Sequence, residues 1–104
     1  MSQVKQPQNK VPTKIERVLA YLLTGQSLNR FEAERIVNDH CLHSTMSALK
    51  NRYDIIYKEK PELVPGWNQQ PTRVMRYWLS SEMYNKAIEV LQQMRRRRDG
   101  ARAA

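Results

Sequence analysis

Residues 41–60, CLHSTMSALKNRYDIIYKEK, combine a helical pattern with a run of β-branched residues. The apolar residues of the first part recur at helical spacing and are Met46, Leu49 and Tyr53. The strand-forming residues directly behind them are Ile55, Ile56 and Tyr57. The stretch therefore predicts a helix over about residues 43–53, anchored by its apolar face and followed at once by extended chain.

The face opposite these anchors is expected to point to solvent, and its side chains are small or form hydrogen bonds. They are Ser44, Thr45, Ser47, Ala48, Lys50 and Asn51. Such a helix fits a DNA major groove about 12 Å wide, where Asn pairs with adenine and Ser or Thr serve bases or phosphates. Lys50 and Arg52 at the flanks suit phosphates, and the N-terminal end of the helix can receive another. The pattern favours base readout over ordinary exposed serines.

Two helices are expected before this stretch, and each begins at a candidate capping box. Thr13 with Glu16 opens the first, which ends by Gly25, and Asn29 with Glu32 opens the second. The apolar stripe of the first comprises Ile15, Val18, Leu19, Leu22 and Leu23. The second, shorter helix is expected to turn inward Phe31, Ala33 or Glu34, Ile36 and Val37.

Behind the stretch, the sequence predicts a loop, a second strand and a closing helix. The loop, residues 61–71, holds three prolines and a Pro65-Gly66 turn, and residues 72–79, TRVMRYWL, alternate like a strand. The apolar stripe of the closing helix comprises Tyr84, Ala87, Ile88, Leu91 and Met94. The predicted fold is mainly α with a small β-hairpin: three helices, two strands and a C-terminal helix.

The net charge of +8 on 104 residues is concentrated at the two ends of the chain. The first fourteen residues carry +3 and residues 95–104 carry +4, so the part between them is nearly neutral. The basic ends suggest a polyanionic partner, although such ends are sometimes only solubilising. The candidate phosphate contacts at the C-terminal end are Arg95, Arg96, Arg97 and Arg98.

These signals divide the chain into four parts. Residues 1–12 are expected to be a disordered basic arm, and residues 13–79 the folded domain. Residues 80–98 form the C-terminal helix, which either covers the core or pairs with a second copy through residues 81–94. The second reading is preferred because residues 13–79 are expected to close a core unaided. Residues 99–104 are expected to be a disordered basic tail, and residues 95–104 to lie outside the core.

The run STMSAL at residues 44–49, together with the predicted hairpin, resembles the winged helix-turn-helix DNA-binding proteins. The likeness covers residues 13–79 and is greatest to the small proteins of this family in bacteriophages and prophages. It implies that residues 43–53 are the recognition helix and that the hairpin, or wing, contacts the DNA backbone. Lys58 and Arg73 are the candidate wing contacts, although the wing tip, VPGWNQQ, carries no charge.

Other residues suggest weaker alternatives. Trp67 in the loop either stacks on a nucleotide, contacts a partner or folds back over the hairpin, whereas Tyr77 and Trp78 are expected to pack within the hairpin. The segment HCLH at residues 40–43 is a poor zinc site, because three ligands within four residues cannot easily surround a tetrahedral ion. No catalytic constellation, metal site or cofactor motif is predicted.

The sequence thus predicts sequence-specific binding of double-stranded DNA by a phage- or prophage-type transcriptional regulator. The alternative is a small phage-type interaction protein that inhibits a host protein through the same fold, which Trp67 and the uncharged tip favour. A single cysteine, Cys41, excludes an internal disulfide and is consistent with a reducing bacterial cytoplasm. No apolar run approaches the roughly 20 residues that a membrane span needs.

Overall fold

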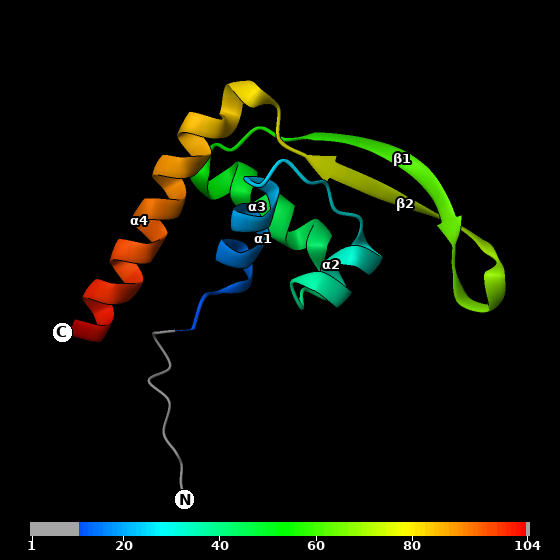
Figure 1. Cartoon of the computed structure of the whole chain (residues 1–104), viewed down its shortest axis with the longest axis horizontal. Helices are drawn as coiled ribbons and strands as arrows, with labels where there is room; N and C mark the ends of the chain where they lie inside the picture. Colours follow the sequence, from blue (N-terminus) through cyan, green and yellow to red (C-terminus); the bar gives the residue numbers. More distant parts are fainter. Residues whose placement is uncertain (1–10, 104) are drawn as a thin grey trace, which may run out of the picture.

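The computed structural model describes residues 11–103, in which three helices lead into a hairpin and a long final helix (Figure 1). The elements are α1 (Lys14–Leu22), α2 (Arg30–Ile36), α3 (Leu42–Tyr53), β1 (Lys58–Pro65), η2 (Trp67–Gln69), β2 (Pro71–Trp78), η3 (Ser81–Met83) and α4 (Tyr84–Ala103). The expected order of helices and strands is confirmed. Within the described residues, no helix is both long and apolar enough to cross a membrane. Most of the arm predicted at residues 1–12 lies outside the described residues.

The predicted N-caps fix the residues at which the first two helices begin. The Thr13 hydroxyl accepts a hydrogen bond from the Glu16 amide at 3.2 Å, and α1 ends at Leu22, shortly before Gly25. Asn29 and Glu32 form a complete capping box, with bonds of 2.9 and 3.0 Å in the two directions. The Glu16 carboxylate does not complete a box of this kind, because it binds Arg98 of α4 instead.

The core lies between α1, α3 and α4 and is closed by the base of β2. Its buried residues include Leu19 and Leu22 of α1 and Met46 and Leu49 of α3. Helix α4 contributes Ala87, Val90 and Leu91 to the same cluster. The apolar stripe of α4 thus takes part in the core, as in the reading in which this helix covers it.

Two residues assigned to inward faces point outward instead. Ile36 at the end of α2 and Ile88 of α4 are both exposed, the latter to 43%. Val37 is buried as predicted, whereas Val90 belongs to the core in place of Ile88. The homodimer contact predicted through residues 81–94 stays a prediction, and only the outer face of α4, with Ile88, is free for it.

The hairpin is longer than the sequence suggests. β1 pairs antiparallel with β2 from Lys58↔Trp78 to Pro65↔Pro71, so the segment expected to be a loop supplies residues 61–65 of β1. The residues expected to begin the strand form a connector, in which Ile55 is fully buried and Ile56 is exposed. Leu28 bridges the other edge of β2 through bonds of 3.0 and 2.8 Å with Tyr77. These bonds tie the base of the hairpin to the helices.

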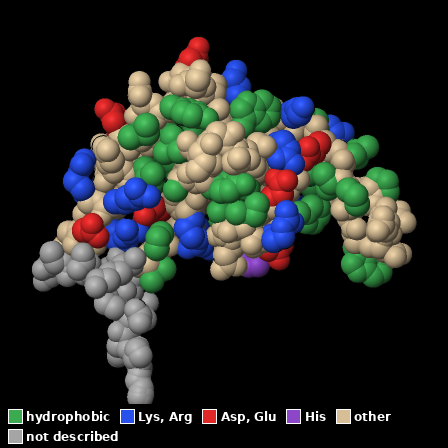
Figure 2. Space-filling view, viewed as in Figure 1, with side chains coloured by type: hydrophobic (Ala, Val, Ile, Leu, Met, Phe, Trp, Pro, Cys, Tyr) green, Lys and Arg blue, Asp and Glu red, His purple; other side chains and the backbone are tan. Residues whose placement is uncertain are grey.

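The hairpin projects from the helices and ends in a tight turn (Figures 1 and 2). The turn closes with a 2.7 Å bond from the Gly66 amide to the Gln70 carbonyl. Asn68 and Gln69 adopt left-handed backbone angles, and a Cβ on Gly66 would collide with the Thr72 side chain. The Pro65-Gly66 turn predicted from the sequence thus falls at the hairpin tip.

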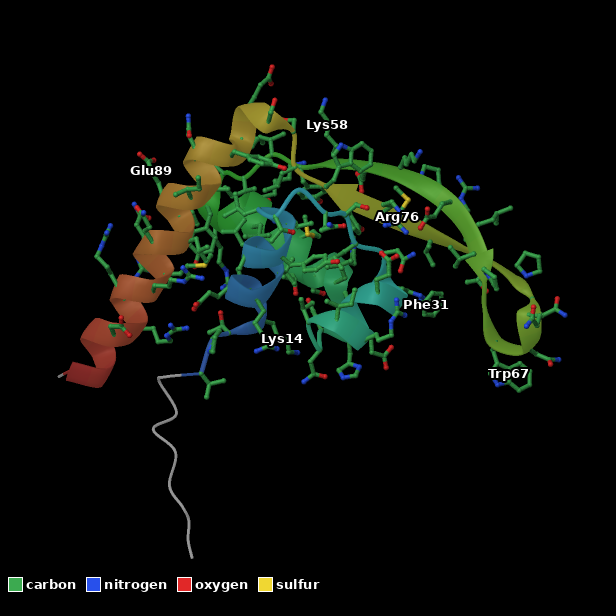
Figure 3. The ribbon with its side chains drawn as sticks, viewed as in Figure 1. Lys14, Phe31, Lys58, Trp67, Arg76 and Glu89 are labelled. Atoms are coloured by element: carbon green, nitrogen blue, oxygen red, sulfur yellow. The ribbon has the colours of Figure 1, made fainter. Side chains whose placement is uncertain are left out.

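Arg76 of β2 fixes the hairpin against α2 (Figure 3). Its guanidinium donates to Glu62 of β1 at 2.9 and 3.0 Å, to Glu32 of α2 at 2.9 and 3.1 Å, and to Ser27 at 2.7 Å. Burial opposes the charged form of Glu32, but the hydrogen bonds from Arg76 and Asn29 lower its pKa overall. Hydrogen bonds from Arg76 and Asn29 likewise lower the pKa of Glu62.

Helix α4 continues to Ala103, five residues beyond the predicted end at 98. Arg98 lies within this helix and donates to both oxygens of Glu16 at 2.7 and 2.6 Å. The Glu16 side chain is only 4% exposed. The expectation that residues 95–104 stand apart from the folded domain is therefore wrong, because one of their arginines satisfies a buried carboxylate.

Candidate nucleic-acid interface

Helix α3 presents a line of exposed side chains on the face opposite its core anchors. Ser44 and Asn51 are exposed and Ser47 is half-buried, and their spacing of three and four residues places them on one side of the helix. Ala48 is half-buried beside them, and Lys50 is exposed at one flank. Met46 and Leu49 are fully buried on the opposite face, so the packing of α3 holds this polar line in place.

Thr45 does not belong to this face, contrary to the prediction. It is 6% exposed, and its hydroxyl donates to the carboxylate of Asp39 at 2.5 Å. The physical reason is its position one turn before Leu49, which places both residues on the core side of the helix. Thr45 therefore helps to fix the beginning of α3 and cannot contact a base from this position.

The N-terminal end of α3 already holds an anionic group. Fully buried Asp39 accepts the Cys41 amide at 2.9 Å as well as the Thr45 hydroxyl. A carboxylate here complements the partial positive charge of the helix N-terminus. It also opposes the approach of a phosphate, so the expectation that this end receives one loses its support.

A groove beside the same end of α3 gathers three cationic or titratable side chains. We call it the hairpin-side groove; it has a volume of about 390 Å³ and is lined by Arg30, Leu42, His43, Arg73, Val74, Met75 and Tyr77. It brings the predicted residue Arg73 to α3. Arg30 and His43 were not predicted, because the meeting of α2, α3 and β2 is a tertiary contact. Of these two residues, only His43 could have been predicted from the sequence, because it precedes Ser47 by one helical turn and so lies on the same face.

Lys58 stands apart from this groove. It pairs with Trp78 at the base of the hairpin, whereas Arg73 pairs with Leu63 nearer the tip. In Figure 3 Lys58 lies on the outer side of the hairpin, away from the helices. The structure therefore brings Arg73, but not Lys58, to α3.

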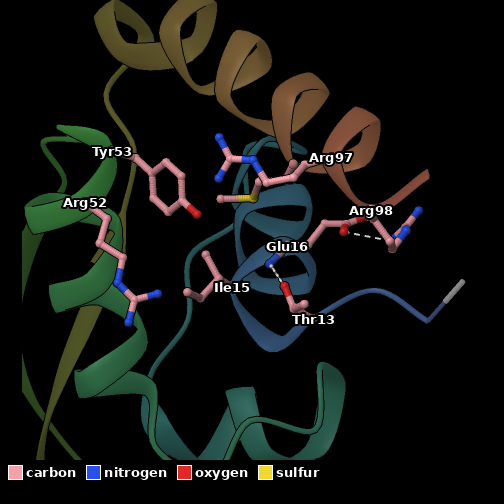
Figure 4. A pocket seen from close by; sticks show the side chains of 8 residues that line it. Thr13, Ile15, Glu16, Arg52, Tyr53, Arg97 and Arg98 are labelled. Atoms are coloured by element: carbon pink, nitrogen blue, oxygen red, sulfur yellow. Dashed lines mark hydrogen bonds and ion pairs between the residues drawn. The ribbon is translucent and has the colours of Figure 1, made fainter. Parts of the chain in front are cut away.

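Arg52 faces a second pocket, far along α3 from the hairpin-side groove (Figure 4). We call it the α4 pocket; it is lined by Thr13, Ile15, Glu16, Arg52, Tyr53, Met94, Arg97 and Arg98. Arg95 and Arg96 are exposed on α4, and the Nε atom of Arg95 lies 3.5 Å from Glu16. Arg98 is hydrogen-bonded to both oxygens of Glu16, and this contact argues against its predicted role as a phosphate contact. The predicted basic residues are thus spread over several surfaces and do not form one patch.

The hairpin tip is uncharged and open to solvent. Trp67 is 88% exposed and Leu63 is 72% exposed, so the reading in which Trp67 folds back over the hairpin is wrong. Figure 2 shows no acidic or basic side chain at the end of the hairpin. Tyr77, in contrast, is buried and meets Tyr57 edge to face at 5.4 Å, as expected of a packing residue.

No protein-family model matches the sequence, and no curated protein matches it. Among residues 11–103, no three side chains of His, Cys, Asp or Glu are grouped so that they could hold a metal ion.

Proposed function

We propose that the protein binds double-stranded DNA sequence-specifically as a winged helix-turn-helix protein, with α3 as recognition helix and the β1–β2 hairpin as wing. The observation that carries the proposal is the line of exposed Ser44, half-buried Ser47 and exposed Asn51 on a helix whose other face is anchored by Met46 and Leu49. A phage- or prophage-type transcriptional regulator, working in a bacterial cytoplasm, is the role that fits this reading.

Each side chain on the line has a definite task in this mechanism. Asn51 pairs with an adenine edge, Ser44 and Ser47 donate to bases or phosphates, and Ala48 lies against a thymine methyl. Lys50 and Arg73 neutralise phosphates on either side of the groove. The small size of these residues lets the helix approach the base edges closely.

The hairpin-side groove extends this surface. Arg30, His43 and Arg73 gather there from three different elements, so one phosphate could accept hydrogen bonds from several donors. Arg95 and Arg96 remain candidate contacts to the DNA backbone outside the specific site. Every such contact should contribute about 0.9 to the slope of log K against log salt.

Selection of bound duplexes from a random oligonucleotide pool tests the proposal, because every possible target sequence competes in the same pool. The full chain should enrich one sequence motif, and Asn51→Ala should lose preference at one position of it by about 1–3 kcal/mol. Asn85→Ala is the matched control, since Asn85 is exposed on α4 and is not among the proposed DNA contacts. Failure of the full chain to enrich any motif would contradict sequence-specific binding.

A second candidate function is supported by the hairpin tip. Trp67 at the uncharged tip and Leu63 further down β1 are both exposed apolar side chains, which suit contact with a protein better than contact with phosphates. In this reading the chain binds and inhibits a host protein. Trp67→Ala then abolishes partner binding, while Asn51→Ala leaves it intact; the DNA reading expects Asn51→Ala to have the larger effect on DNA selection.

A further inference from the structure

The α4 pocket has the size and chemistry of a ligand site. It measures about 360 Å³, within the range of roughly 300–1,000 Å³ that is usual for small-molecule sites. Ile15 of α1, Tyr53 of α3 and Met94 of α4 line it, and all three are only partly buried against the core. An apolar surface made by three elements therefore remains accessible inside the pocket.

Two arginines border this apolar surface with their charges open to a ligand. Arg52 comes from the C-terminal end of α3 and Arg97 from α4, and in Figure 4 Arg52 lies on the α3 side of Ile15 and Arg97 on the α4 side. Both are exposed, and neither forms an ion pair with another side chain of residues 11–100. A guanidinium whose donors are open can bind a carboxylate or phosphate through two hydrogen bonds.

The acidic residue in the pocket does not cancel these charges. Glu16 is bound by Arg98 at 2.6 and 2.7 Å and lies 3.5 Å from Arg95. Its negative charge is therefore already neutralised by α4. Arg52 and Arg97 leave the pocket with a net positive potential beside an apolar wall.

We propose that the α4 pocket binds a small organic anion, in which an aromatic or alkyl body packs on Ile15, Tyr53 and Met94 while an acidic head group pairs with Arg52 and Arg97. A DNA backbone would use the arginines but not the apolar wall, because its phosphates are separated from apolar surface by polar sugars. An uncharged apolar ligand would use the wall but not the arginines. The pocket therefore selects molecules that carry both an apolar body and an acidic head group. This ligand site is proposed independently of DNA binding.

Titration of the full chain with 2-naphthalenesulfonate, followed by NMR chemical shifts and calorimetry, tests the proposal. The probe joins an aromatic body to an acidic head, and its two halves can be supplied separately as 2-naphthol and inorganic sulfate. We expect saturable binding of one probe per chain, with shifts at Ile15, Tyr53 and Met94. Each half alone should bind about tenfold more weakly or worse, since it lacks one set of contacts.

Single substitutions locate the site. Arg97→Gln and Arg52→Gln should each weaken the probe about tenfold, as expected for the loss of a charge-assisted hydrogen bond. Arg96→Gln removes the same charge from an exposed neighbour outside the pocket and should change affinity less than about twofold. Equal binding by the Arg96 and Arg97 variants would overturn the proposal, as would an absence of saturation. Sulfate or 2-naphthol binding as tightly as the complete probe would overturn it too.

Discussion

Thr45 and Ser44 show how a single position decides the role of a side chain on α3. The two hydroxyl residues are neighbours in the sequence, yet Ser44 is exposed and Thr45 is buried on Asp39. The spacing of four residues between Thr45 and Leu49 already indicated the core side of the helix. Buried Asp39 could not be foreseen, because an aspartate before a helix is usually exposed and its partner comes from the following turn.

We expect Thr45→Val to destabilise the protein by about 1–3 kcal/mol, because it leaves the buried carboxylate of Asp39 with one donor fewer. The shape of the side chain is nearly preserved, so little of the loss can come from packing. Urea unfolding measures the change. Ser44→Ala is the control and should stay within about 0.5 kcal/mol of the parent. A Thr45→Val midpoint equal to that of the parent would show that the bond to Asp39 contributes no net stability.

β1 shows where the sequence misled at the scale of an element. Pro61 and Pro65 suggested a loop, but β1 pairs with β2 on one side only, and prolines are tolerated on such an edge strand. Ile55 and Ile56 suggested a strand, but Asp54, which follows the last residue of α3, adopts a left-handed conformation, and Ile55 behind it lies in the core. The helices were predictable because their caps and apolar periods are local. The extent of the hairpin was not predictable in the same way. It depends on which edge of β1 is left unpaired, and that is decided by the tertiary structure.

Arg76 gives the hairpin a testable dependence on pH. Because the pKa values of Glu32 and Glu62 are lowered in the folded protein, their stabilisation is present above the unfolded value of about 4.3 and is lost as pH falls through the folded values. Arg76→Gln should cost about 1–3 kcal/mol at pH 7 and flatten this acid dependence. Urea unfolding between pH 3 and 7 measures both effects.

Arg73→Gln is the control for Arg76→Gln, since Arg73 is exposed on the same strand and forms no ion pair with another described residue. It should leave the pH dependence of unfolding unchanged. If Arg76→Gln and the parent lost stability in parallel on acidification, the carboxylates of Glu32 and Glu62 would not be coupled to Arg76 in solution.

At the scale of the whole molecule, α4 is both a cover for the core and the source of a buried ion pair. We expect truncation after Met94 to cost about 3 kcal/mol, because it leaves the Glu16 carboxylate buried without Arg98. Adding Glu16→Gln to the truncated chain should restore much of the loss by removing the charge. Thermal or urea unfolding of the two truncated chains and the parent measures the difference.

Truncation after Arg98 is the matched control, since it keeps the ion pair and removes only the last six residues. It should unfold close to the parent. Equal stability of the chains that end at Met94 and at Arg98 would show that the contact between α1 and α4 does not hold the molecule together.

The bond between Glu16 and Arg98 joins residues 82 positions apart in the chain. A ribosome adding about 5–20 residues per second needs roughly 4–16 s to make the segment between them. Throughout that time the nascent helix α1 carries a carboxylate whose native partner has not been synthesised. The native core is therefore completed only after α4 has been synthesised. A chain that terminates before Arg98 keeps the Glu16 carboxylate without its native partner.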